Sequence, residues 1–355
     1  MGATTAERAA MRRALELAAQ VPARGPNPRV GCVLLDADDS TISEGFHRGA
    51  GTPHAEVEAL RRASESRGPG AARGATAVVT LEPCNHHGRT GPCVDALLGA
   101  GVARVVHAQQ DPNPAASGGA ARLRAAGVDV LGSVLADEAR ALNATWSRAL
   151  ELGRPVVTWK VASTLDGRAA AADGTSRWIT GRAARHGVHR LRAGVDAVVV
   201  GTGTVLADDP DLTVRHAPLT GQQPERVVVG LRDLPASSRL ARAAAAGEAV
   251  MQLRTHDPHE VLDLLWYREH RHVLLEGGPA LAAAFWRAGL VDDVVAYVAP
   301  VLLGNGASAV ADLGIGTIAD AARLDLLDVA VLPRDPEDPT DTPTVRLTLR
   351  PRKER

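Results

Sequence analysis

Strand-like runs of valine, alanine and leucine alternate with helical patterns, and this alternation restricts the possible folds more than any other feature. In residues 1–152 we expect strands at 30–35, 75–81, 104–108 and 128–131, and helices at 6–20, 54–66, 94–100, 116–126 and 137–152. Strands that alternate with helices form sheets covered by helices on both faces. The pattern therefore predicts a three-layer α/β/α sandwich with a mainly parallel sheet.

A second α/β pattern begins after Gly153-Arg154-Pro155, a run that ends the last helix of the first pattern. Here we expect strands at 156–162, 197–201, 226–230, 272–276, 293–298 and 344–349, and helices near 182–193 and 279–288. A chain of 355 residues is long enough for two domains. We therefore expect a first domain at 1–152 and a second at 153–355.

Composition restricts the partners and the location. A formal net charge of −1 gives no electrostatic reason to expect a nucleic acid or an acidic membrane surface as partner. The sequence has no run of about 18 apolar residues, so we expect no membrane span. Three cysteines do not suggest a disulfide framework, which fits a reducing, cytoplasmic location.

Two short segments carry the residues of a metal site. The first is Thr52-Pro53-His54-Ala55-Glu56, and the second is TLEPCNHHGRTGPC, which runs from position 80 to position 93. His54, Cys84 and Cys93 supply one imidazole and two thiols. A hydrolytic zinc site uses such a set, with water at the fourth position and a nearby glutamate that does not bind the metal. We therefore predict one zinc ion in the first domain.

Glu56 is predicted to carry the proton in this reaction. Zinc lowers the pKa of its bound water from about 15.7 to about 7, and a carboxylate beside it can pass the proton to a leaving amine. The expected chemistry is hydrolytic deamination of a nucleobase-like ring. Taken singly, His54 is more readily a surface histidine and the cysteines small buried residues; only the joint pattern indicates a site. Cys32 lies in an apolar run and is expected in a core strand.

Helix starts are expected to position the metal ligands. Thr52 is a suitable N-cap, which places Pro53 at the first helical position and His54 in the first turn. Pro92 repeats the arrangement ahead of Cys93. A thiol at a helix N-terminus has a depressed pKa and is ready to bind metal as a thiolate.

Four segments of the second half have the character of a ligand site, namely 159–167, 174–180, 200–215 and 275–279. Glycines between a strand and a helix let backbone N–H groups approach a phosphate. Any one segment is more readily an ordinary βα turn, and Gly201-x-Gly203 lacks the third glycine of the Rossmann fingerprint. Together they indicate a nucleotide cofactor site, with Arg192 and Arg215 available for an anionic substrate.

These residues resemble the bifunctional riboflavin-biosynthesis deaminase–reductase family. The resemblance rests on the runs 27–33, 53–57 and 80–93, including residues 85–92 between the two cysteines, and on 160–167, 178–180, 204–210 and 276–278. It covers nearly the whole chain. It implies a cytidine-deaminase-like domain followed by a dihydrofolate-reductase-like domain. The implied reactions are zinc-dependent deamination of 2,5-diamino-6-ribosylamino-4(3H)-pyrimidinone 5′-phosphate and NADPH-dependent reduction of the ribosyl group to ribityl.

The resemblance also implies roles for individual positions. Those matching zinc ligands are His54, Cys84 and Cys93, with Glu56 as proton carrier. Those matching cofactor contacts are Ser163, Trp178, Thr204, Asp208, Gly278, Pro279, Ala280, Leu281, Ala282, Ala283 and Ala284. Those matching substrate contacts are Ser176, Arg192, Leu212, Arg215 and Glu276. The family often has an acidic residue where Gly230 stands, so that contact stays unassigned. A homo-oligomer formed through the second domain is also expected.

Other interpretations remain open at this point. A nucleoside or tRNA deaminase shares the histidine, glutamate and cysteines, but has a shorter cysteine spacing and does not need residues 156–350. A structural zinc module usually has four protein ligands, and His86 or His87 would have to supply the fourth. His47, His86 and His87 have no assigned role. Asp208 either orients cofactor and sugar or only caps a turn.

Overall fold

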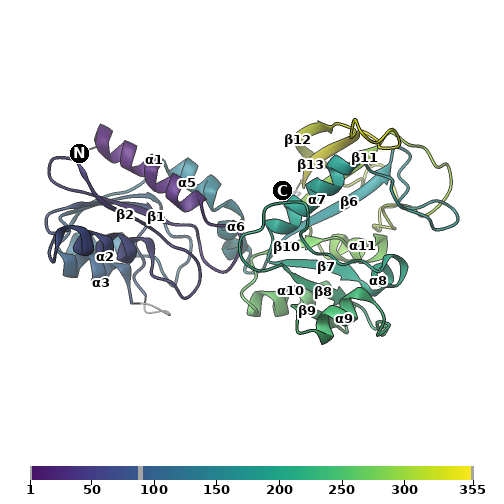
Figure 1. Ribbon diagram of the computed structural model, residues 1–355, viewed down its shortest axis with the longest axis horizontal. Helices are drawn as coiled ribbons and strands as arrows, with labels where there is room; N and C mark the ends of the chain where they lie inside the picture. The colour runs from purple at the N-terminus through teal and green to yellow at the C-terminus, as the bar shows by residue number, and fades with distance from the viewer. Residues whose placement is uncertain (1, 87–90, 353–355) are drawn as a thin grey trace. The chain divides into compact units, whose positions relative to one another are not determined.

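The computed structural model describes residues 2–86 and 91–352, and it divides the chain into two compact units, Met1–Gly153 and Arg154–Arg355 (Figure 1). Each unit has its own sheet, with five strands in the first and eight in the second. Within the described residues, no helix combines the length and the apolar composition that crossing a membrane requires.

The first unit is a mixed sheet with helices on both faces. Its strands are β1 (Gly31–Leu35), β2 (Thr41–Phe46), β3 (Thr76–Leu81), β4 (Arg104–Gln109) and β5 (Asp129–Leu131), in the order β2-β1-β3-β4-β5. Its helices are α1 (Thr5–Ala19), α2 (Ala55–Arg67), α3 (Cys93–Ala100), α4 (Gly119–Ala125), α5 (Ala136–Leu142) and α6 (Ala144–Leu152). β3, β4 and β5 are parallel, whereas β1 is antiparallel to both β2 and β3. Four of the five strands therefore run in the same direction, as expected for a mainly parallel sheet, and only β1 is reversed, because the tight turn at 36–40 makes β1 and β2 a hairpin.

The two helical layers hold separate parts of the core. Met11 and Leu17 of α1 pack against Val33 and Val78 on one face of the sheet, together with α5. On the other face, α2, α3 and α4 pack against the remaining side chains of the same strands (Figure 1). A β-carbon at Gly45 would lie 2.4 Å from the carbonyl oxygen of Ala55. The missing side chain of Gly45 thus lets the start of α2 lie directly on β2.

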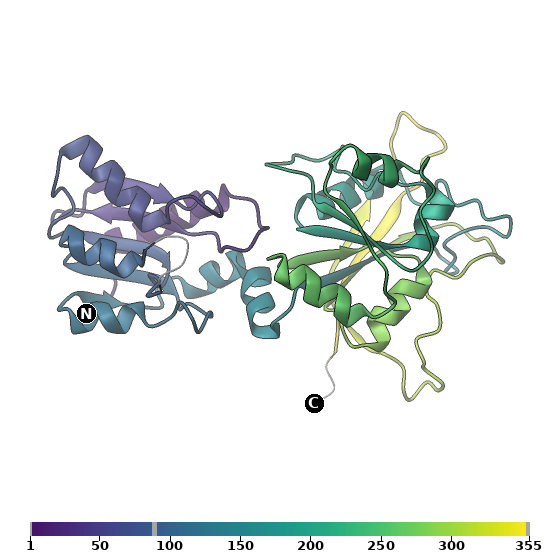
Figure 2. The same cartoon turned by 90° about the horizontal axis from the view of Figure 1, so that it is seen from below.

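The second unit is a larger sheet between two helical layers (Figure 2). Its strands are β6 (Val156–Thr164), β7 (Ala197–Gly201), β8 (Glu225–Val229), β9 (Val250–Leu253), β10 (His272–Leu275), β11 (Asp293–Ala299), β12 (Leu324–Leu332) and β13 (Thr344–Pro351), in the order β12-β13-β11-β6-β10-β7-β8-β9. Its helices are α7 (Arg182–Ala193), α8 (Thr202–Asp208), α9 (Arg239–Ala245), α10 (Pro258–Tyr267) and α11 (Pro279–Arg287). Strands β6 to β11 are parallel, and β12 and β13 form an antiparallel edge.

The strand order creates a switch point between β7 and β10. The chain leaves β7 toward its neighbour β8, whereas it leaves β10 in the opposite direction, toward β11 beyond β6. Ligands of open α/β sheets bind beyond the carboxyl ends of the strands where successive connections diverge in this way. The topology therefore places a ligand site at the ends of β7 and β10.

The sequence did not predict every element. Strands β2, β9 and β12 and helices α8, α9 and α10 were absent from our expectations. The expected helix at 137–152 is two helices that meet at Asn143. The side chain of Asn143 accepts a hydrogen bond from the Arg29 backbone nitrogen at 2.9 Å and donates one to the Arg29 carbonyl at 2.9 Å. These tertiary contacts hold Asn143 where a continuous helix would not place it.

Candidate active sites

Three residues from separate elements converge in the first unit. His54 immediately precedes α2, Cys84 follows β3, and Cys93 is the first residue of α3. The Nδ1 atom of His54 lies 3.1 Å from Cys93 Sγ and 3.6 Å from Cys84 Sγ. The backbone nitrogen of Cys93 also donates to Cys84 Sγ at 3.3 Å. The three potential ligand atoms lie within 4.8 Å of one another.

The start of α2 differs from the expectation. The helix begins at Ala55 and His54 is its N-cap residue, so Thr52 does not cap it and Pro53 is not its first residue. Instead, the hydroxyl of Thr52 donates to the carbonyl of Gly49 at 2.7 Å, which closes the turn before the helix. Because His54 has extended backbone angles, its ring is directed by this turn rather than by the helix.

The donor set fits a zinc ion. Zinc bonds of about 2.0–2.1 Å to nitrogen and about 2.3 Å to sulfur separate tetrahedral ligands by about 3.5 Å, close to the distances between His54 and the two thiols. In the described part of the chain, the group of potential ligands contains His54, Cys84 and Cys93 but not His86. His87 lies outside the described residues. Three protein ligands leave a position for water, as in catalytic zinc sites.

Glu56 lies in the first turn of α2 and is 3% exposed. Burial raises the pKa of its carboxyl group to about 7, while the nearby His54 acts in the opposite direction. The carboxyl group also contacts the Cys93 thiol. A carboxyl group that gains and loses a proton near neutral pH, placed beside the metal ligands, suits a general acid and base.

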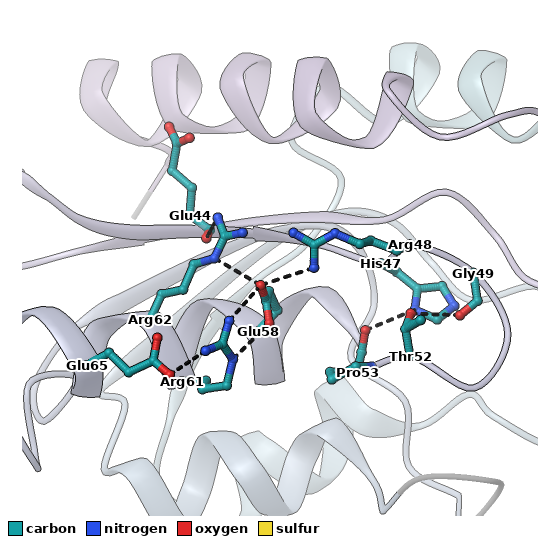
Figure 3. A network of polar contacts seen from close by, with 10 residues as sticks. All are labelled: Glu44, His47, Arg48, Gly49, Thr52, Pro53, Glu58, Arg61, Arg62 and Glu65. Atoms are coloured by element: carbon teal, nitrogen blue, oxygen red, sulfur yellow. Dashed lines mark hydrogen bonds and ion pairs between the residues drawn. The ribbon is translucent and has the colours of Figure 1, made fainter. Parts of the chain in front are cut away.

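His47 lies against His54, with ring centroids 5.2 Å apart. Its Nε2 atom lies 2.8 Å from the side-chain nitrogen of Asn27. Its Nδ1 atom lies 3.0 Å from the carbonyl oxygen of Pro53 (Figure 3). An amide nitrogen only donates and a carbonyl only accepts, so Nδ1 carries the proton and Nε2 accepts. Burial lowers the pKa of His47, which keeps the ring neutral. Sequence reasoning left His47 unassigned, and the structure places it beside the metal ligands.

A buried ion-pair network supports the same loop. Glu58 of α2 is 3% exposed, and its carboxylate accepts hydrogen bonds from Arg48, Arg61 and Arg62 at 2.9 to 3.2 Å (Figure 3). These hydrogen bonds hold the pKa of Glu58 near 2. Arg48 follows His47 in the chain, so Glu58 fixes the segment that carries His47 to the helix that carries Glu56.

Glu82, two residues before Cys84, ties the Cys84 turn to the segments that follow β4. Its carboxylate accepts hydrogen bonds from the backbone nitrogens of Ala120 at 2.9 Å and Asp111 at 3.3 Å. Burial raises the pKa of Asp111 to about 6. His86 lies in the same turn, and among the described residues its buried Nδ1 atom has no hydrogen-bond partner. Sequence reasoning did not single out Glu82 or Asp111, although both follow strands at the edge where ligands of α/β sheets bind.

In the second unit, the two segments at the switch point contact each other. The backbone nitrogen of Gly278, before α11, donates to the hydroxyl of Thr204, in α8, at 3.0 Å. A β-carbon at Gly278 would lie 3.3 Å from that hydroxyl, and one at Gly277 would lie 2.9 Å from Leu281. Glycine at both positions therefore keeps the backbone accessible to a phosphate. Two predicted cofactor contacts, Thr204 and Gly278, are thus adjacent, and residues Pro279 to Ala284 form the first turns of α11.

Arg192 and Glu276 form a buried pair beside this point. The guanidinium donates to both carboxylate oxygens at 2.6 and 2.9 Å, and to the carbonyl of Thr213 at 3.1 Å. The sequence did not predict this pairing with Glu276, and the substrate contact expected of Arg192 stays a prediction. Burial lowers the pKa of Lys160, in β6, while the charges of Glu276 and Asp208 oppose this shift. The sequence signal for Lys160 was a single lysine within the apolar β6 run.

The remaining predicted contacts lie on three segments. Ser163 is near the carboxyl end of β6, and Ser176 and Trp178 lie in the loop before α7. The Trp178 indole is 69% exposed, with the guanidinium of Arg185 4.8 Å from its ring centroid. Leu212 and Arg215 follow α8; Leu212 is buried, whereas Arg215 pairs with Asp211 at 2.8 Å.

Asp208 is the last residue of helix α8 rather than part of an open turn. Its neighbour Asp209 accepts a hydrogen bond from the backbone nitrogen of Arg239, at the start of α9, at 2.7 Å. Asp209, not Asp208, therefore makes the contact with the start of α9, whose N-cap residue is Ser238. The Asp208 carboxylate acts electrostatically on the partly buried Lys160.

Comparisons with known proteins match both units. The model of the cytidine and deoxycytidylate deaminase zinc-binding region matches residues 4–109, and the model of the RibD C-terminal domain matches residues 155–335. The riboflavin biosynthesis protein RibD of Mycobacterium tuberculosis is 51% identical over 301 residues, which cover 84% of this chain and 86% of that protein. Its counterpart in Escherichia coli is 41% identical over 357 residues, covering 90% and 95%.

The chain belongs to the RibD family of riboflavin-biosynthesis deaminase–reductases.

Solved structures of the RibD family share the fold over the whole chain. RibD of Acinetobacter baumannii has a TM-score of 0.82 and 41% identity, and covers 98% of this chain and 99% of its own. A deaminase–reductase of Thermotoga maritima has a TM-score of 0.80 and 32% identity, with the same coverage. The predicted fold class is therefore confirmed. This protein is a bifunctional enzyme of riboflavin biosynthesis, with a zinc-dependent deaminase and an NADPH-dependent reductase activity.

Proposed function

We propose that the first unit deaminates 2,5-diamino-6-ribosylamino-4(3H)-pyrimidinone 5′-phosphate and that the second unit reduces the ribosyl group of the product. The observation that carries this division is the convergence of His54, Cys84 and Cys93 beside the buried Glu56 within the first unit. The switch point of the second unit, with its glycine turns, supports the placement of the reductase site there.

Glu56 carries the proton in the proposed deamination. A zinc ion bound by the two thiols and His54 would supply the Lewis acidity that makes water a nucleophile at neutral pH. The Glu56 carboxylate takes one proton from this water as its oxygen bonds to the ring carbon. It then gives the proton to the amino group, so the carbon–nitrogen bond breaks and ammonia leaves. His47, whose ring nitrogens contact Asn27 and Pro53, lies against His54 beside this site.

In the proposed reduction, most of the gain in rate comes from holding the nicotinamide against the sugar. NADPH, when bound, would supply a hydride for the first sugar carbon of the imine that forms when the ribosylamine ring opens. Thr204 and the Gly278 turn hold the cofactor, and Lys160 donates a proton as the sugar opens; burial lowers its pKa toward the range that suits such a donor. Arg215 holds the phosphate of the substrate, and Asp208 orients Lys160 and the sugar hydroxyls.

The Glu56→Gln variant tests the deaminase assignment. Glutamine keeps the size of the side chain but cannot carry a proton, so we expect loss of ammonia release with zinc content unchanged. NADPH oxidation with deaminated substrate should also stay normal, which serves as the control for folding. If zinc is lost together with ammonia release, Glu56 is a ligand or a folding residue and the proposed role is wrong.

Asp208 and Asp209 form a matched pair for the reductase assignment. Asn at position 209 can still accept the hydrogen bond from the Arg239 backbone nitrogen, so Asp209→Asn should keep near-normal NADPH oxidation. Asp208→Asn removes the charge that acts on Lys160, and we expect a fall in kcat of roughly a hundredfold. Equal effects of both substitutions would mean that Asp208 is structural and that the reductase site lies elsewhere.

The two activities should also be separable. Fragments 1–153 and 154–355 each contain one of the compact units with its own core. We expect the first fragment to bind zinc and release ammonia, and the second to oxidise NADPH when given deaminated substrate. A first fragment that is folded but inactive would show that the second unit contributes to the deaminase site.

We also propose a homo-oligomer formed through the second unit. The edge strands present an apolar sheet face beyond the buried Val294, which consists of Ala296 and Val298 of β11, Val345, Leu347 and Leu349 of β13, and Leu326, Val329 and Val331 of β12. Residues paired across strands lie on the same face. Val329 is 51% exposed and Val331 is 74% exposed. An apolar patch of this kind usually marks an interface, and a second copy of the chain offers the same patch for a two-fold symmetric contact.

The oligomer proposal is tested by sedimentation. Val331→Asp places a charge at the centre of such a contact and should shift the protein to monomers. Ile318→Asp, at a loop position that is 86% exposed, is the matched control and should leave the mass unchanged. A wild-type protein that sediments as a monomer at all concentrations would contradict the proposal.

We also propose that the protein is located in a reducing compartment such as the cytoplasm. All three cysteines are free, and Cys84 and Cys93 belong to the metal group. An oxidising compartment would join thiols as close as these in a disulfide and destroy the ligand set. Separation of cell fractions, followed by detection of the protein, tests this location.

A further inference from the structure

The turn after β8 is held in place from the neighbouring strand β9. The side-chain nitrogen of Gln252 donates to the carbonyls of Gly230 at 3.0 Å and Arg232 at 2.8 Å. Arg254 donates to the carbonyl of Leu231 at 3.0 Å. Three successive carbonyls of this turn are thus bound on the β9 side. This fixes the backbone from which the Arg232 side chain extends.

Arg232 extends toward the switch point. A β-carbon at Gly203, in the first turn of α8, would lie 3.2 Å from the Nη2 atom of Arg232. The next residue, Thr204, accepts the hydrogen bond from Gly278. The guanidinium of Arg232 therefore lies close to the residues that we assign to the cofactor. In the described part of the chain it forms no ion pair, whereas the nearby Asp233 is paired with Arg254.

The direction of the bound cofactor follows from the strand order. Lys160 of β6 and the Arg192–Glu276 pair mark the substrate side, where the nicotinamide must lie. The pyrophosphate would then lie at the ends of β7 and β10, where the starts of α8 and α11 offer backbone N–H groups. The adenosine half consequently extends to the other side, over the end of β8. At that place Arg232 is a cation for which the described residues supply no ion-pair partner.

The chemistry of the β8 turn favours a phosphate over a hydroxyl group. NADPH differs from NADH only by a phosphate on the 2′ oxygen of the adenosine ribose. In dinucleotide-binding folds, an acidic residue near this ribose binds the 2′-hydroxyl of NADH, and an arginine accommodates the 2′-phosphate. Gly230 has φ +135, and a β-carbon there would lie 2.6 Å from the Thr202 hydroxyl. The first position of the turn therefore accepts only glycine, which excludes an acidic side chain from it.

We propose that Arg232 binds the 2′-phosphate of NADPH and thereby sets the preference of this reductase for NADPH over NADH. The inference rests on the proposed placement of the cofactor at the ends of β7 and β10. Arg177 and Arg185 are the competing cations, and both lie beside Trp178. Arg177 donates to the carbonyl of Asp208, which places this pair on the substrate side rather than at the adenosine.

Direct binding of cofactors to the full-length, zinc-loaded chain tests the proposal. Calorimetric titration with NADPH, NADH and adenosine 2′,5′-bisphosphate measures each dissociation constant without turnover. Arg232→Gln should raise the Kd of NADPH and of the bisphosphate by about 10- to 100-fold, as expected for lost charge-assisted hydrogen bonds. The Kd of NADH should stay within about twofold, and Arg232→Lys should restore part of the NADPH affinity.

Two further variants distinguish an error in the assignment of Arg232 from an error in the placement of the cofactor. Arg185→Gln is the matched arginine control and should leave the ratio of the NADPH and NADH constants unchanged; a changed ratio here, with none in Arg232→Gln, would overturn the proposal. Thr204→Val removes the hydroxyl that holds Gly278 and should weaken both cofactors equally. If it does so while Arg232→Gln changes neither constant, the inference about Arg232 is wrong and the cofactor site stands. If Thr204→Val also changes neither, the cofactor placement is wrong, and the inference falls with it.

Discussion

Removing Arg192 should destabilise the second unit far more than a typical surface substitution. Its guanidinium makes hydrogen bonds of 2.6 and 2.9 Å to Glu276 and one of 3.1 Å to Thr213. The side chains are only 11% and 7% exposed. In Arg192→Met the carboxylate of Glu276 stays buried without its main partner. Breaking such a pair costs about 3–5 kcal/mol of unfolding free energy, and because Lys160 also acts on Glu276, we expect a value near the lower end, about 3 kcal/mol.

The double variant separates the charge effect from lost packing. In Arg192→Met with Glu276→Gln no carboxylate is left unpaired, so its cost should be smaller than the sum of the two single costs by about 1–3 kcal/mol. Urea unfolding followed by tryptophan fluorescence provides the measurement. Trp159 and Trp286 pack in the core of the second unit, and a Trp146→Phe background removes the tryptophan of the first unit.

The pH dependence gives the same experiment a second readout. Burial alone would raise the pKa of Glu276, but the pairing with Arg192 outweighs it and the net shift is downward. A carboxylate with a depressed pKa stabilises the fold above its unfolded pKa of about 4.3, and this contribution is lost as the pH falls. The stability difference between wild type and Glu276→Gln should therefore shrink below about pH 4. If the unfolding free-energy costs of Arg192→Met and Glu276→Gln add up to that of the double variant within about 0.5 kcal/mol at pH 7, the reasoning is refuted.

Three other changes have clear expected outcomes. Gly230→Ala should destabilise the second unit by about 1–3 kcal/mol in urea unfolding, because φ is +135 and the new β-carbon would lie 2.6 Å from the Thr202 hydroxyl; an unchanged midpoint would contradict the geometry. Removal of zinc with a chelator should abolish ammonia release but leave the Kd of NADPH unchanged, since the two sites belong to different units. Glu58→Gln should lower kcat for deamination through the His47 segment while zinc content stays normal, and Glu65→Gln, at the exposed end of the same network, should be neutral.

The sequence predicted the parts of the fold and the sites that depend on local chemistry. The apolar runs at β3, β4 and β7 and the His54, Cys84 and Cys93 spacing were recognisable because burial and metal binding demand particular residue types. Helix α10 was missed although Asp257 and Pro258 provide a good helix start, so that signal was present. Strand β2 was missed because half of its residues are polar, and its place beside β1 follows from the hairpin.

Pairings between distant residues were beyond sequence reasoning. Arg192 and Glu276 are far apart in the chain, and only the strand order brings α7 to the end of β10. Free arginines and paired arginines look the same in a sequence, which is why Arg192 was expected to be available. The start of α2 was shifted for a similar reason, because Thr52 closes a preceding turn with Gly49 instead of capping the helix. Tertiary contacts thus decide whether an arginine is paired and where a helix begins.

The most direct test of the account is to follow both products in one sample of the wild-type, zinc-loaded protein supplied with 2,5-diamino-6-ribosylamino-4(3H)-pyrimidinone 5′-phosphate. Without NADPH, ammonia should be released in an amount equal to the substrate consumed. With NADPH present, one cofactor molecule should be oxidised for each ammonia released. Glu56→Gln should abolish both signals, and added deaminated substrate should restore NADPH oxidation alone. Oxidation of NADPH by Glu56→Gln with the original substrate would contradict the proposed order of the two reactions and the assignment of Glu56.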